Sequence, residues 1–150
     1  MARDTWLIRY EQMKRRIMEA NSRNRDALMS LLTQLNIAHV VVNYDGSGDS
    51  GQIESIGFYD ADNSFIENPA FETTKPIPWF DNQLKLNSDS MSIPDAIEKL
   101  CYDYLEIHHG GWENNEGAYG EFRFDVAKNT ISLTHLDRII STEMTEHDDL

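Results

Sequence analysis

The longest regular pattern in the sequence is a stripe of apolar and small residues that runs through residues 4–35. Its members recur mainly at intervals of three or four, which places them on one face of an α-helix. The stripe passes through polar residues around Ser22 that favour helix ends over helix interiors. We therefore expect one long N-terminal helix with a weak centre, or two helices joined near Ser22. The stripe consists of Trp6, Tyr10, Met13, Ile17, Ala20, Ala27, Leu28, Leu31 and Leu35.

Two β-hairpins are expected from shorter patterns. Segments 37–44 and 52–59 are rich in β-branched residues and flank a glycine-rich loop, which predicts the first hairpin. Segment 118–126 alternates apolar with charged residues, and 130–138 follows it after a three-residue turn. This second pattern predicts another antiparallel hairpin.

The remaining segments complete an α+β fold. A turn at 60–63 predicts a short strand around 64–67, whereas 68–91 is polar, contains proline and is expected to be irregular. Ser92 is a suitable cap for a second helix over 93–108, because Pro94 and Asp95 suit a first helical turn. We predict an antiparallel sheet of two hairpins plus a short strand, with helix 93–108 packed on one face.

A chain of 150 residues is expected to form one domain around one hydrophobic core. We divide it into an N-terminal helical segment, 1–36, an α+β body, 37–140, and an acidic tail, 141–150. Charge is uneven between these parts. The net charge is −13, with +3 over residues 1–36 and −16 over the rest. A body this acidic repels nucleic-acid phosphates and attracts basic surfaces, so we expect a basic protein partner and no direct DNA binding.

The expected location is the cytoplasm. No run of apolar residues is long enough to span a membrane, and no signal peptide is evident at the N-terminus. Cys101 is the only cysteine, which rules out an internal disulfide and fits a reducing compartment.

The loop over residues 45–51 combines carboxylates, hydroxyls and glycines, which together can surround Ca²⁺ or Mg²⁺. Its candidate binding residues are Asp45, Ser47, Asp49 and Ser50. The loop departs from the calcium-loop template, because Ser50 occupies the position of the glycine and Ile56 that of the bidentate glutamate. A glycine-rich hairpin connection is the alternative interpretation.

A second polar loop follows helix 93–108. Trp112 within it is either an interface anchor or a ring folded back over the core. The adjacent histidines, His108 and His109, lack the spacing of a zinc site. No catalytic residue is assigned. The further candidate binding residues are Glu113, Asn114, Asn115 and Glu116, and the candidate metal ligands are Asp45, Asp49 and Glu113.

Both loops resemble paired signatures of an uncharacterised domain family found in bacteria and phages. The segments that carry the resemblance are YDGSGDSGQIE at 44–54 and HGGWENNEGAYGEF at 109–122. The similarity covers about the last three-quarters of the chain. The resemblance implies a mobile-element setting, and no catalytic role is carried over because the family has no assigned activity.

Two functions are compatible with these features. The first is a non-enzymatic acidic interaction or inhibitor protein without a cofactor, which mimics DNA and occupies the groove of a nucleic-acid-handling protein. The alternative is a divalent-metal-dependent enzyme or regulator that uses Asp45, Asp49, Glu113 and Glu116. A homodimer through the N-terminal helix is compatible with both.

Overall fold

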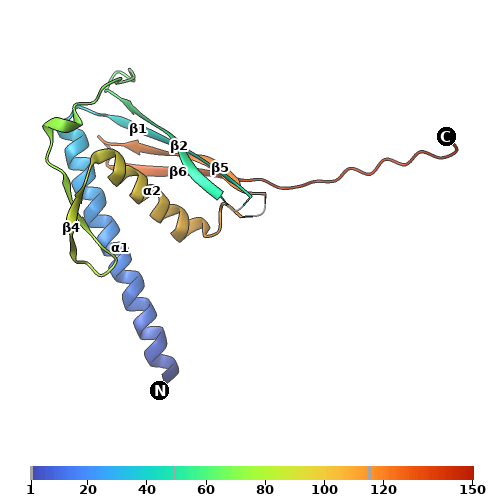
Figure 1. Ribbon diagram of the computed structural model, residues 1–150, viewed down its shortest axis with the longest axis horizontal. Helices are drawn as coiled ribbons and strands as arrows, with labels where there is room; N and C mark the ends of the chain where they lie inside the picture. Colours follow the sequence, from blue (N-terminus) through green and yellow to red (C-terminus); the bar gives the residue numbers. More distant parts are fainter. Residues whose placement is uncertain (1, 49, 115) are drawn as a thin grey trace.

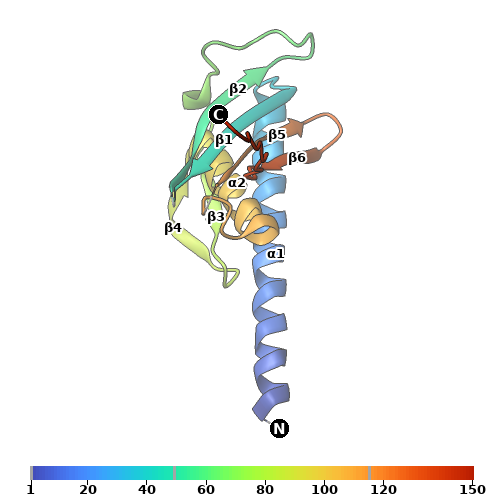
Figure 2. The same cartoon turned by 90° about the vertical axis from the view of Figure 1, so that its right-hand side faces the viewer.

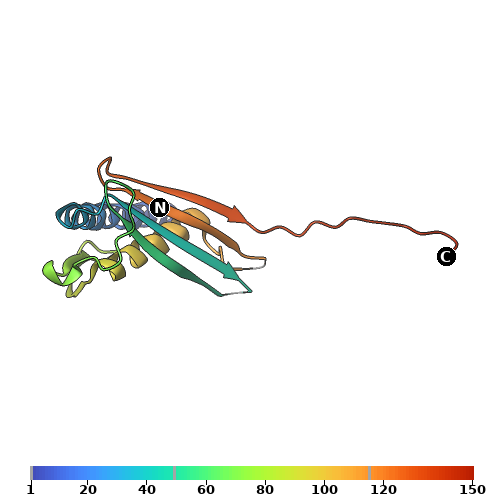
Figure 3. The same ribbon diagram turned by 90° about the horizontal axis from the view of Figure 1, so that it is seen from above.

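The computed structural model describes residues 2–48, 50–114 and 116–150 and has two layers (Figure 1). One layer is an antiparallel sheet with strand order β2-β1-β5-β6, and the other contains the helices α1 and α2 (Figures 1 and 3). The predicted α+β fold class is confirmed. In chain order the elements are α1 (Ala2–Gln34), β1 (His39–Ser47), β2 (Ser50–Tyr59), η1 (Phe71–Thr73), β3 (Ile77–Phe80), β4 (Leu86–Met91), α2 (Ile93–His109), β5 (Ala118–Asp125) and β6 (Thr130–Asp137).

Helix α1 is continuous and has no break at Ser22. In its C-terminal half, Leu28 and Leu32 are fully buried because they lie one helical turn apart on the face toward the sheet. The helix ends at Gln34. Two residues later, the φ of Asn36 is 57°, in the left-handed region, and the amide of Ile37 donates to the carbonyl of Leu32 at 3.0 Å. This pattern is a helix C-cap in which one residue adopts the left-handed conformation, and asparagine takes the position that glycine usually occupies.

The N-terminal half of α1 projects beyond the sheet (Figure 2). Trp6, Tyr10 and Met13 belong to the predicted apolar stripe, yet they are 67%, 45% and 47% exposed. Burial on this helix begins at Ala20. Self-association through the exposed half stays a prediction. Within the part of the chain that the structure describes, no helix combines the length and hydrophobicity needed to cross a membrane.

Both predicted hairpins are confirmed, and β1 joins them by pairing with β2 on one side and β5 on the other. Val42 of β1, for example, lies opposite Ile56 on one side and Phe122 on the other. The strands alternate between a buried and a more exposed face, as expected for a sheet covered on one side. The buried face carries Val40, Val42, Tyr44, Phe122 and Phe124.

The segment between β2 and α2 is more ordered than expected. The predicted short strand at 64–67 consists of a single bridge between Phe65 and Tyr59. The prediction that 68–91 is irregular is wrong over its second half, where β3 and β4 form a separate two-stranded sheet. Pro78 obscured this hairpin in the sequence, because proline removes a hydrogen-bond donor and is tolerated only in strands with an unpaired side.

Helix α2 matches the predicted helix to within a residue. The hydroxyl of Ser92 accepts a hydrogen bond from the amide of Asp95 at 3.3 Å, and Pro94 lies in the first turn. The helix packs on the sheet through Ile93, Ala96, Ile97, Leu100, Cys101 and Leu105, all of them buried.

Asn24 joins helix α1 to β3. Its side chain is 1% exposed, its Nδ2 donates to the carbonyl of Phe80 at 3.0 Å, and its Oδ1 accepts from the amide of Phe80 at 2.9 Å. The asparagine amide thus pairs with the β3 backbone as a neighbouring strand would. These two hydrogen bonds fix the small sheet on the helix.

We predict that Asn24→Ala lowers the free energy of unfolding by about 2 kcal/mol, because it leaves two part-buried backbone groups of Phe80 without partners. Urea unfolding followed by circular dichroism measures the change. Ser22→Ala, at an exposed position of the same helix, is the control and should change stability by less than about 0.5 kcal/mol. Equal effects of the two substitutions would show that Asn24 does not fix the small sheet.

Candidate functional site

The two glycine-bearing loops meet at one end of the sheet. Trp112, which follows α2, lies directly against Gly46 of β1 and Gly51 of β2. A Cβ atom at Gly46 would lie 2.5 Å from the indole ring, and one at Gly51 would lie 2.4 Å from it. Only glycine therefore permits the close approach of the ring to the two strands.

Trp112 is 7% exposed, and its ring meets that of Tyr44 edge to face at a centroid distance of 5.3 Å. Of the two alternatives for this residue, the structure supports the ring packed in the core. A side chain this enclosed cannot act as an exposed interface anchor without leaving the two glycines.

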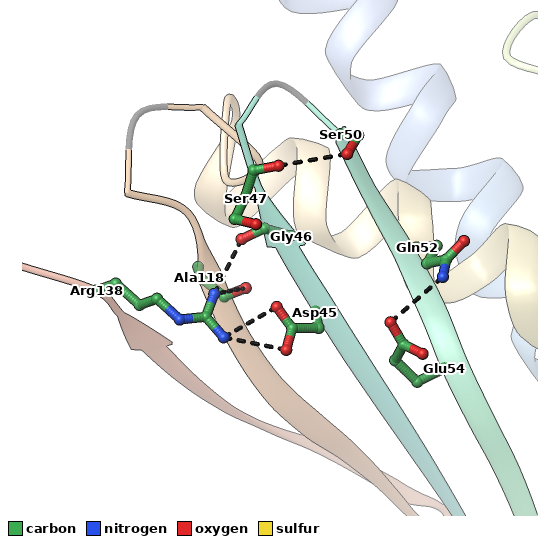
Figure 4. A network of polar contacts seen from close by, with 8 residues as sticks. All are labelled: Asp45, Gly46, Ser47, Ser50, Gln52, Glu54, Ala118 and Arg138. Carbon is green, nitrogen blue, oxygen red and sulfur yellow. Dashed lines mark hydrogen bonds and ion pairs between the residues drawn. The ribbon is translucent and has the colours of Figure 1, made fainter.

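Asp45 is bound by Arg138, which was not among the site residues predicted from the sequence (Figure 4). Nη2 of Arg138 donates to both carboxylate oxygens of Asp45 at 2.9 and 3.0 Å, and Nη1 donates to the carbonyl of Gly46 at 3.0 Å. The guanidinium also lies 4.8 Å from the ring centroid of Tyr119. Arg138 therefore neutralises Asp45 and ties the end of β6 to β1.

The predicted metal ligands do not form a ready site in the described ranges. Asp45 would have to leave Arg138 to bind a cation, and Asp49 lies outside the described residues, as does the predicted binding residue Asn115. Across residues 2–48, 50–114 and 116–150, no group of three or more His, Cys, Asp or Glu side chains is arranged to hold a metal ion. A calcium or magnesium site stays a prediction.

Of the other predicted binding residues, Ser47, Ser50, Asn114 and Glu116 border two open hollows. One hollow of about 260 Å³ is lined partly by Ser47 and Ser50, and the hydroxyl of Ser50 donates to the carbonyl of Ser47 at 3.3 Å. The second, of about 330 Å³, is lined partly by Asn114 and Glu116. Glu113 is half-buried beside Gly51. The second hollow also includes His109, Asp137 and Arg138.

A histidine network lies behind the second hollow. The side chain of His135 is 5% exposed, its Nδ1 is 2.5 Å from the Tyr44 hydroxyl, and its Nε2 is 3.0 Å from a carboxylate oxygen of Asp137. The ring of His109 stacks on that of His135 at 3.7 Å. Sequence reasoning missed His135, although it continues the inward alternation of Ile131 and Leu133 on β6.

Burial fixes the protons in this network. Burial, with a smaller contribution from the charge of Asp137, raises the pKa of Tyr44, so its hydroxyl stays protonated and donates to His135 Nδ1. His135 then carries its own hydrogen on Nε2 and donates it to Asp137. Burial, and next the neighbouring His135, lowers the pKa of His109. The network is a set of fixed hydrogen bonds that orients Asp137 at the edge of the hollow.

We predict that Gly46→Ala lowers the free energy of unfolding by about 2 kcal/mol, because the new methyl group overlaps the ring of Trp112. Thermal and urea unfolding measure the change. Ser47→Ala, at the next and exposed position, is the control and should be nearly neutral. In a Trp112→Leu background the cost of Gly46→Ala should shrink, and an unchanged cost would show that the ring is not the cause.

We predict that His109 contributes a loss of stability as the pH drops from about 7.5 to about 5.5. Its folded-state pKa is lower than the ordinary value of 6.5, so the unfolded chain binds more protons in this range. The contribution of the neutral His109 side chain to the free energy of unfolding is therefore fully present above pH 6.5 and is lost as the pH falls below that value. His109→Gln should reduce the difference in unfolding free energy between the two pH values.

His147→Gln, in the exposed C-terminal tail, is the control for loss of a histidine and should leave the pH dependence unchanged. Identical pH profiles for His109→Gln and the unsubstituted protein would contradict the assignment.

Comparison with known proteins identifies a family for most of the chain. A family model described as a family of unknown function, DUF6878, matches residues 20–149, a range that includes both loops, β6 and Arg138. Comparison with curated proteins and with solved structures found no match. The bacterial and phage distribution implied by the resemblance stays a prediction. The matched range covers most of the chain, and the chain therefore belongs to the DUF6878 family of unknown function.

Proposed function

We propose that the protein is a non-enzymatic acidic interaction protein that binds a basic protein partner through the glycine-rich end of its sheet. The observation that carries the proposal is the ion pair between Arg138 and Asp45. Because the guanidinium of Arg138 is already bound to Asp45, it does not neutralise the other acids at this end of the sheet. Glu113, Glu116 and Asp137 have no Lys or Arg partner among the residues that the structure describes. Their charge is therefore available to an external cation.

The rest of the body reinforces this charge. Beyond Asn36 the chain carries twenty-two acids and six cations. Three of these cations, Lys99, Arg123 and Arg138, already pair with Asp103, Glu121 and Asp45, so most of the acids have no cation to pair with. The chain leaves the sheet beside Arg138 and continues into an exposed segment (Figures 1 and 3). The acids of that segment are Glu143, Glu146, Asp148 and Asp149.

A nucleic-acid-handling protein is the partner class that we propose. Its binding groove is basic because it accepts phosphates, and carboxylates held on a rigid sheet end can occupy such a groove as a DNA mimic. Inhibition of that partner, a phage or mobile-element origin, and a cytoplasmic location are parts of the same proposal. The acidic body itself would be repelled by DNA.

The test is a pull-down of basic proteins from a bacterial extract at about 50 mM and about 500 mM salt. We expect retention to fall at least about tenfold at the higher salt, because exposed charges are screened within about 8 Å or less above physiological ionic strength. The triple variant Glu113→Gln, Glu116→Gln, Asp137→Asn should lose retention at low salt. Duplex DNA should compete for the basic groove of the retained partner and so release the partner from the acidic protein.

The matched control removes the same number of charges from the opposite end of β2, with Asp62→Asn, Glu67→Gln and Glu72→Gln. These residues are exposed, and the control should retain most of the binding. Equal losses in both triple variants would show that net charge, and not the glycine-rich end, drives association. A melting temperature that rises with Ca²⁺ or Mg²⁺ and falls with EDTA would favour the metal-dependent function instead.

A further inference from the structure

A groove of about 480 Å³ separates α1 from the C-terminal end of α2. It is lined by large apolar side chains that are unusually exposed for a folded protein. Tyr10, Met13 and Met18 on α1 are 45%, 47% and 59% exposed, and Ile107 on α2 is 45% exposed. Such a continuous apolar groove indicates a docking surface.

Two hydrogen-bond donors in the wall of this groove have no acceptor within the described part of the chain. Asn21 is only 6% exposed, and its Nδ2 has no partner among the described residues. Nε of Arg25 is also buried without a partner in that part of the chain, although its Nη2 donates to the carbonyl of Asn129. Buried donors without acceptors are rare in folded proteins, so these two indicate a ligand that supplies oxygen atoms.

The charge around the groove selects an acidic ligand. Lys14 lines it together with Arg25, and Glu106 is the acid in its lining. Residues 1–36, which include the α1 wall, carry a net charge of +3. The ligand that fits is therefore a peptide with carboxylates and with apolar side chains to cover the exposed walls.

The C-terminal segment of this chain, residues 139–150, has that chemistry. It bears four carboxylate side chains and no lysine or arginine. Its apolar residues are more exposed than those of the groove. Ile139, Ile140, Met144 and Leu150 are 84%, 71%, 83% and 103% exposed.

The segment also begins close to the groove. His108 lines the groove, and the next residue, His109, stacks on His135 at 3.7 Å, near the end of β6 where the segment begins. A segment of this length spans up to about 40 Å when extended, and a short tether gives a high effective concentration.

We propose that the groove between α1 and α2 is the docking site for the chain's own C-terminal segment, residues 139–150. In the structure this segment extends away from the body (Figure 1), which is the undocked arrangement. On docking, carboxylate and carbonyl oxygens would meet Asn21, Arg25 and Lys14, and the apolar side chains would cover Met13 and Met18. The inference does not rest on the proposed function.

Disulfide trapping in the full chain tests the proposal, because the native Cys101 is buried and does not interfere. The pair Met18→Cys and Met144→Cys joins the groove to the segment. Under mild oxidation we expect an internal disulfide in a product of monomer mass. The control pair, Thr134→Cys and Met144→Cys, places a thiol at an exposed position of β6 near the start of the segment. The groove pair should form its disulfide at least about tenfold faster than the control pair.

Charge variants separate docking from random collision. Lys14→Glu should slow trapping in the groove pair, whereas Lys75→Glu, at an exposed position outside the groove lining, should not. Adding Glu143→Lys and Glu146→Lys to Lys14→Glu should restore the rate. Equal rates for the groove and control pairs would overturn the proposal, and so would a product of dimer mass, which would assign the groove to the segment of a second copy. Circular dichroism confirms that each variant is folded.

Discussion

The packing of Trp112 against Gly46 and Gly51 is the contact on which the arrangement of this protein depends. The ring follows directly from the end of α2 and lies across the turn end of the first hairpin, so it links the helical layer to the sheet. Its second neighbour, Tyr44, extends the contact inward to His135 and, through that histidine, to Asp137 on β6. One enclosed indole thus connects α2, both hairpins and the polar network. The glycines have a packing role, which explains why a loop with the composition of a cation site need not be one.

Local patterns in the sequence predicted most of the fold. The long stripe of α1, the capped start of α2 at Ser92 and the alternation of Phe122 and Phe124 each depend on neighbours in sequence, and each is present in the structure. The β3–β4 hairpin was missed because Pro78 opposes a strand locally, while the contact that stabilises it comes from Asn24 on a distant helix. A side chain that replaces a strand neighbour leaves no periodic signal.

The candidate site was harder to predict than the fold. Asp45 looked available for a cation, but Arg138 binds it from a position 93 residues away. Trp112 had two interpretations that composition could not separate, and the choice depended on a contact across the two loops. His135 was not predicted because a single histidine in the alternating pattern of a strand does not indicate which side chains it will contact. The excess of negative charge, in contrast, follows from the sequence alone, because it does not depend on which side chains meet.

The unsupported half of α1 has a thermodynamic consequence of its own. From residue 5 to residue 19 every side chain is exposed except that of Ile17, which is half-buried. A separate helix of about this length is only marginally stable in water because its first turn is costly to form. In this protein the packed half of α1, from Ala20 onward, is already helical and therefore nucleates the outer turns. The outer turns can therefore wind and unwind without disturbing the domain, and their helicity should depend on temperature, salt and whatever lies against them. The protein thus joins a cooperative folding unit to an element that follows a helix–coil equilibrium.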